Sequence, residues 1–275
     1  MKNSKRLIVY TLAILVLTGC QTLKVAHYGP PAEKMKKVVI LTTMIDRIYQ
    51  PPLPLIDAGI FNGKTNDIAE EIIILQQSHV NEYRKILANS FRKHFNCQVL
   101  YGESLHSSPQ FTGLVNDYDK PGELYTGNDN FPMVNISDGD INPFSFGGKR
   151  LQKFFQYEPN YRGTLGEMAQ KLETDYIIVS ISQLAVQRVG PFGSNGQLAL
   201  HTTLYVFDDE GIMLTEVSNR STGIFIKGKD PEQYGAVLHD FSVILEPMVQ
   251  GIEARYKTNN PEASQSQGKS NPYIR

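Results

Sequence analysis

The strongest constraint on the fold is a strand, turn, strand, turn, strand pattern between residues 176 and 226. β-rich runs span 176–186, 198–207 and 212–226, separated by the turn-forming segments 190–196 and 208–211. Consecutive runs joined in this way pair as antiparallel neighbours, so they predict a three-stranded meander. In the middle run both sets of alternating residues are fairly apolar near Asp208. We therefore expect that part of the sheet to be covered on both faces.

Other segments supply the remaining elements of an α/β sandwich. Short β-branched runs predict strands at 37–43 and 96–101, and helical spacing of apolar residues predicts helices at 67–95, at 164–172 and from Asp230 onward. Thr164 with Glu167 has the capping-box spacing, Asp230 precedes a proline as an N-cap would, and Pro247 predicts a kink. The expected fold is a mixed sheet with a C-terminal three-stranded meander, packed by two long helices and one short helix.

The stretch 102–161 has a different composition. It is rich in proline, glycine, Asp and Asn and shows no sustained period, which predicts an irregular insertion. It also contains many aromatic residues, so we expect it to pack partly on the domain or on another molecule. They are Phe111, Tyr118, Tyr125, Phe131, Phe144, Phe146, Phe154, Phe155 and Tyr157. We expect a single domain over 38–256 and a disordered polar tail over 257–275.

The first nineteen residues form a basic start followed by about a dozen apolar residues, as export signals do. The apolar run is short for a bilayer span, which takes about 20 apolar residues. It ends in Leu17-Thr-Gly-Cys20, which resembles the lipobox of bacterial lipoproteins. The resemblance implies a signal peptide over 1–19, a thioether lipid on Cys20, cleavage before it and acylation of the new amino terminus. An ordinary signal peptide with a chance cysteine is the alternative.

The lipobox resemblance also implies a location. Gln21 follows the cysteine where an Asp would direct retention, so the enterobacterial rule predicts the outer membrane with the domain in the periplasm. Residues 20–37 then read as a tether between lipid and domain. The leader holds three basic residues and no acidic ones, which leaves 24 basic against 28 acidic residues after it. This balance gives no reason to expect nucleic acid as a partner.

A looser resemblance covers the C-terminal part. Two segments separated by a hairpin carry this resemblance: Leu165-Gly-Glu-Met-Ala-Gln-Lys-Leu-Glu-Thr-Asp-Tyr-Ile-Ile-Val179 and Tyr205-Val-Phe-Asp-Asp-Glu-Gly-Ile-Met-Leu214. Together they resemble the periplasmic domain of curli secretion lipoproteins and of lipoprotein activators of penicillin-binding proteins. The similarity lies in element order and hydrophobic pattern. It implies an envelope domain that binds other proteins. The stretch 102–161 has no counterpart in this pattern.

Few residues in the sequence suggest metal binding or catalysis. The best metal candidates are Asp138, Asp140 and Asn142, because oxygens at alternating positions can converge on Ca²⁺. An EF-hand loop would need Gly and Glu at the positions that Pro143 and Lys149 occupy. A solvated turn is therefore favoured over a calcium site. His94 with Cys97 is at most half a zinc site. The strand-like setting of Cys97 favours a buried, inert thiol. Asp46, Glu173 and Asp175 lie near strand ends, where acids more often serve as caps and turn formers.

These observations support two hypotheses. The first is a lipid-anchored, non-catalytic envelope module, without a cofactor, that binds a protein partner or copies of itself. The second is an envelope hydrolase whose carboxylate site the sequence does not reveal. In neither case does the sequence assign catalytic residues. Cys20 alone receives a definite chemical role.

Overall fold

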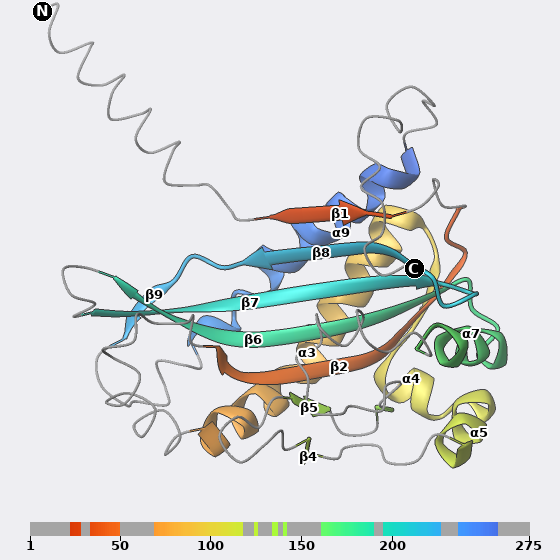
Figure 1. Ribbon diagram of the computed structural model, residues 1–275, viewed down its shortest axis with the longest axis horizontal. Coiled ribbons are helices and arrows are strands. Elements are labelled where there is room, and N and C mark those ends of the chain that lie inside the picture. The colour runs from red at the N-terminus through yellow and green to blue at the C-terminus, as the bar shows by residue number, and fades with distance from the viewer. Residues whose placement is uncertain are drawn as a thin grey trace, which may run out of the picture.

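The computed structural model describes residues 23–28, 34–49, 69–117, 124–125, 134–136, 140–141, 161–189, 195–226 and 236–257. These residues form one mixed sheet with helices on both faces (Figure 1). The predicted α/β fold class is therefore confirmed. The leader, Cys20, the proposed N-cap Asp230 and the C-terminal tail beyond Lys257 lie outside the described residues.

The sheet has the strand order β1, β8, β7, β6, β2, β5, β4, with β3 paired to β2 and β9 paired to β7. Its strands are β1 (Lys24–His27), β2 (Lys37–Tyr49), β3 (Gln98–Leu100), β4 (Leu124–Tyr125), β5 (Val134–Ile136), β6 (Tyr176–Val189), β7 (Asn195–Asp208), β8 (Met213–Arg220) and β9 (Ile224–Ile226). Strand β2 runs parallel to β3 and β6, and the other pairs are antiparallel.

The predicted meander is strands β6, β7 and β8, in that order. The β7–β8 turn forms as expected: Asp208 Oδ1 accepts hydrogen bonds from the backbone N–H groups of Glu210 (3.0 Å) and Ile212 (2.7 Å). Gly211 has a positive φ of 75°, which glycine adopts without steric cost. The third predicted strand is divided, because residues 221–223 separate β8 from β9.

Two long helices cover one face of the sheet, as Figure 1 shows. They are α3 (Ala69–Phe95) and α9 (Phe241–Lys257). The predicted apolar stripe of α3 is buried at Val80, Tyr83, Leu87 and Phe91. Residues 236–238 form a further helical turn before α9, so the predicted C-terminal helix is interrupted at 239–240. Pro247 lies inside α9.

Shorter helices cover the opposite face: α4 (Gly102–His106), α5 (Pro109–Asp117) and α7 (Tyr161–Lys171). Helix α7 is the predicted short helix, but it begins before Thr164, so the proposed N-cap role of Thr164 is wrong. Alternation in β7 explains the two layers: Leu204 and Val206 join the α3 and α9 side, while Tyr205 and Phe207 join the α7 side. The expectation of a sheet covered on both faces is confirmed.

Two sequence interpretations need correction. Residues 102–161 are not irregular throughout, because 102–106 and 109–117 are helical and bury Leu105, Phe111 and Leu114. Of the nine predicted insertion aromatics, Phe111 is buried on α5 and the backbone of Tyr125 lies in β4, whereas the other seven lie outside the described residues. Residues 20–37 are not simply a tether, because Lys24–His27 forms the edge strand β1 and Met35 is fully buried. The folded domain therefore begins well before residue 38.

Candidate functional site

Helix α3 supplies polar side chains to three clusters. The first joins Arg84 to Asp140; the second joins Ser90, Lys93 and His94 to Glu246 and Glu253 on α9; the third brings His79 and Glu82 together with His239. None of the partners from outside α3 is close to it in sequence. The three clusters are therefore products of the tertiary fold.

The first cluster is a buried ion pair. The side chains of Arg84 and Asp140 are 4% and 1% exposed, and Nη2 lies 2.6 Å from Oδ2, in an ionic contact without hydrogen-bond alignment. Asp140 Oδ2 also accepts the backbone N–H of Thr43 at 2.7 Å. Beside it, Thr42 donates its hydroxyl to the Ile141 carbonyl at 2.7 Å. These contacts fasten residues 140–141 to β2 and to α3.

This burial changes the interpretation of the predicted metal candidates. Asp140 does not lie in a solvated turn, because both its oxygens contact protein groups in the interior. Asp138 and Asn142 lie outside the described residues. The structure thus gives Asp140 a role as the counter-ion of Arg84, which the sequence pattern did not indicate.

Asp140 also contacts a histidine, His106. His106 Nε2 lies 3.1 Å from Asp140 Oδ1, and the His106 ring lies against Phe111 with a centroid separation of 5.0 Å. The imidazole is partly exposed, whereas the carboxylate is buried. A buried carboxylate that orients a more accessible imidazole is the arrangement that a general base requires.

The second cluster connects α3 with α9. His94 Nε2 lies 2.8 Å from Glu246 Oε1, and its Nδ1 lies 2.8 Å from Glu253 Oε2. Both ring nitrogens of His94 therefore face a carboxylate oxygen of α9. Hydrogen bonds from Lys93, then Ser90, and the neighbouring His94 lower the pKa of Glu246 to about 2. The cluster is a charged clasp between the two long helices.

Cys97, Glu173 and Asp175 have structural roles. Burial raises the pKa of the Cys97 thiol to about 11, and its Sγ lies 3.7 Å from the Phe91 carbonyl oxygen, so the predicted burial of this thiol is confirmed. Because His94 binds carboxylates, it does not form a half-site with Cys97. Asp175 Oδ2 accepts the backbone N–H groups of Lys36 and Lys37, which joins the residue before β6 to the start of β2. Glu173 adopts a positive φ just after α7, so of these two acids only Glu173 lies in a turn as predicted. The side chain of Asp46 lies outside the described residues.

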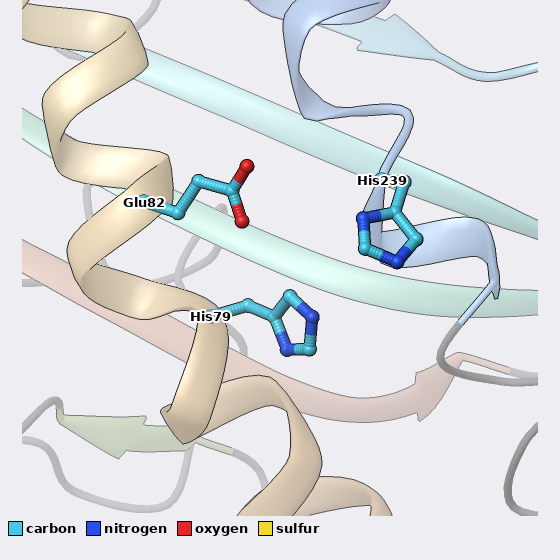
Figure 2. Close-up of side chains that lie close together, drawn as sticks. All are labelled: His79, Glu82 and His239. Carbon is cyan, nitrogen blue, oxygen red and sulfur yellow. The ribbon is translucent and has the colours of Figure 1, made fainter.

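The third cluster has the donor types of a metal site. Figure 2 shows His79 and Glu82 on α3 pointing toward His239 in the turn before α9. One ligand atom from each residue lies within 4.8 Å of the others. Glu82 and His239 are exposed and His79 is half-buried. The His79-x-x-Glu82 spacing places both on one face of a helix and is visible in the sequence, whereas the approach of His239 is not.

Comparisons with known proteins give little further information. No family model matches the chain, and no curated protein matches it. Two PelC dodecamer structures from Paraburkholderia phytofirmans are similar at 11% and 12% identity with TM-scores of 0.31 and 0.30; each comparison covers 85% of this chain and 99% or 97% of the other. The Evf virulence factor is similar at 8% identity with a TM-score of 0.22, covering 86% of this chain and 87% of the other. At these TM-scores the similarities support no inference about this chain.

We predict that Asp140→Ala lowers the free energy of unfolding by about 3–5 kcal/mol, because it leaves the Arg84 guanidinium buried without a counter-ion. Denaturant unfolding of the variant and the parent chain measures this difference. Glu210→Ala is the matched control: it removes the carboxylate from the exposed Arg162–Glu210 contact of 3.5 Å and is expected to cost less than about 1 kcal/mol. Equal effects of the two substitutions would contradict a structural role for the buried pair.

We predict that the clasp between α3 and α9 weakens in acid. Because the pKa of Glu246 is lower in the folded state than its ordinary value of 4.5, its contribution to stability is full above about pH 4.5 and is lost as the pH falls toward about 2. Glu246→Gln should therefore be less stable than the parent chain at neutral pH, by about 1 kcal/mol for a partly exposed ion pair. Unfolding measured across this range should show the difference shrinking toward pH 2, and a difference independent of pH would refute the assignment.

Proposed function

We propose that the chain is a lipid-anchored protein of the bacterial envelope whose α/β domain is a non-catalytic binding or assembly module. The observation that carries the proposal is the Leu17-Thr-Gly-Cys20 sequence at the end of a basic and apolar leader. A lipidated cysteine attaches a protein to a membrane without a spanning helix. Among the helices that the structure describes, none has the length and apolar character to cross a membrane.

The position of β1 in the sequence supports attachment of the domain close to the membrane. Only three residues separate Cys20 from Lys24, the first residue of β1. A fully extended chain advances about 3.3–3.6 Å per residue, so the Cα atoms of Cys20 and Lys24 are at most about 14 Å apart. A lipid on Cys20 would therefore hold the β1 edge of the sheet next to the bilayer.

The side chains at this edge are compatible with a nearby bilayer. Leu23 and Val25 are 36% and 37% exposed, and both lie beside Gly251 of α9. The described residues contain one other exposed large apolar side chain, Val243, which is on α9 as well. The exposed large apolar side chains of the described residues thus lie on β1, its preceding residue and α9. We propose that the membrane faces this edge and that the outer membrane is the location.

The proposed partner is another envelope protein or a second copy of the chain. The aromatic-rich stretch 102–161 supports this part of the proposal, because it contains more aromatic residues than the packing of α4 and α5 requires, and aromatic residues are enriched at protein interfaces. Phe111 packs within the domain, and the remaining aromatic side chains of the stretch are outside those described. The excess of acidic over basic residues in the chain after the leader argues against nucleic acid.

An envelope hydrolase is the second candidate function. The observation that favours it is the contact of His106 with buried Asp140, because a carboxylate of this kind can orient a general base. Under this alternative His106 and Asp140 belong to the catalytic site. Under the favoured proposal Asp140 is the counter-ion of Arg84, and His106 completes its hydrogen bonding.

We predict that the full chain, expressed in a bacterial host fed an alkyne fatty acid, acquires the label at Cys20. Mass spectrometry should find the label on an amino-terminal peptide that begins at Cys20. Cys20→Ser should abolish the label, whereas Cys97→Ala, which removes the only other cysteine, should retain it. An unlabelled parent chain, or a labelled Cys20→Ser variant, would contradict the proposal.

A further inference from the structure

We propose that His79, Glu82 and His239 bind a Zn²⁺ ion that ties α3 to the segment preceding α9. The inference goes beyond the proposed anchoring function and does not depend on it. It starts from the donor types: two imidazoles and a carboxylate, contributed by two separate elements. Zinc is bound by imidazole nitrogen and carboxylate oxygen at about 2.0–2.2 Å, and three protein ligands leave a fourth position for water.

The geometry needs only small side-chain adjustments. The three ligand atoms lie within 4.8 Å of one another, and a tetrahedral zinc ion with bonds of about 2 Å holds its ligands roughly 3.3 Å apart. Glu82 and His239 are exposed, so their side chains can rotate without disturbing the core. The rings of His79 and His239 already lie near each other, with a centroid separation of 5.6 Å and an interplanar angle of 78°.

The backbone on which these ligands stand is fixed by buried neighbours. On α3, Val80 and Tyr83 are buried directly after His79 and Glu82. Before and after His239, Leu238 and Phe241 are buried. The rings of Tyr83 and Phe241 also pack together at a centroid distance of 4.8 Å, which joins the two elements beside the cluster. Ligands held on a rigid frame lose little freedom when they bind a metal ion.

A neighbouring contact assigns the ligand atom of His79. Ser78 Oγ lies 3.0 Å from His79 Nδ1, so Nε2 is the nitrogen assigned to the ion. A hydrogen bond to the second ring nitrogen orients a metal-binding imidazole and fixes its tautomer. Together, these contacts describe a three-ligand site at the solvent-exposed side of the α3 and α9 layer.

The test is a Zn²⁺ titration of the full chain, purified in detergent and stripped with a chelator, against a chromophoric competitor. We expect one equivalent of zinc to bind. Both His239→Ala and Glu82→Gln should weaken binding at least tenfold, since each removes a ligand from an exposed position. Glu103→Gln is the matched control, because it neutralises an exposed acid on α4 outside the cluster, and Cys97→Ala tests the buried thiol. Both controls should bind like the parent chain.

A second readout separates a structural tie from adventitious binding. Zinc at about one hundred times the parent chain's dissociation constant should raise the Tm of the parent chain by roughly 5–10 °C and that of His239→Ala by at most about half as much. Parent-like binding by His239→Ala, or the absence of binding to the parent chain, would overturn the proposal. Loss of zinc binding in Cys20→Ser alone would place the ion on that thiol and equally refute the site. The first two results do not bear on the fatty-acid label, whereas the third would also contradict a lipid on Cys20. The label experiment therefore distinguishes failure of the zinc site from failure of the lipidation.

Discussion

The ion pair between Arg84 and Asp140 fixes the position of α3 on the sheet. Each charge is shielded from water, and Asp140 is bonded to β2 through the Thr43 N–H. Because an unpaired buried charge is costly, α3 cannot slide along β2 without breaking this pair. The Tyr83 hydroxyl makes a second buried contact, with Ser180 on β6. The positions of His79, Glu82 and His94 along α3, and so the two other clusters, follow from this register.

Local patterns predicted the elements that are built from them. The spacing of Val80, Leu87 and Phe91 identified α3, and the alternation around Tyr205 identified a strand buried on both faces. Helices α4 and α5 were missed because glycine, proline and polar residues dominate the stretch that contains them. Strand β1 was missed because four residues next to a Gly-Pro-Pro sequence resemble a linker, and only pairing with β8 makes them a strand.

The candidate sites divide in the same way. The lipidation prediction at Cys20 depends only on neighbouring residues in the sequence and stays a prediction. The pairing of Asp140 with Arg84 and the approach of His239 to α3 depend on tertiary contacts, so no single-sequence pattern could supply them. The calcium interpretation of Asp140 illustrates the cause: alternating acids look alike whether the fold leaves them in solvent or places one beside a buried guanidinium.

The central claim is that a lipid on Cys20 holds the β1 edge at the bilayer, and tryptophan quenching tests it most directly. The chain contains no Trp, so a single substitution gives an unambiguous signal. Leu23→Trp places the reporter before β1, and Gly113→Trp places it on α5, on the opposite side of the molecule in Figure 1, where added atoms meet open space. In vesicles of acyl-brominated lipids carrying the lipidated chain, the account predicts strong quenching of Leu23→Trp and little quenching of Gly113→Trp. Equal quenching of both, or none of either, would contradict it.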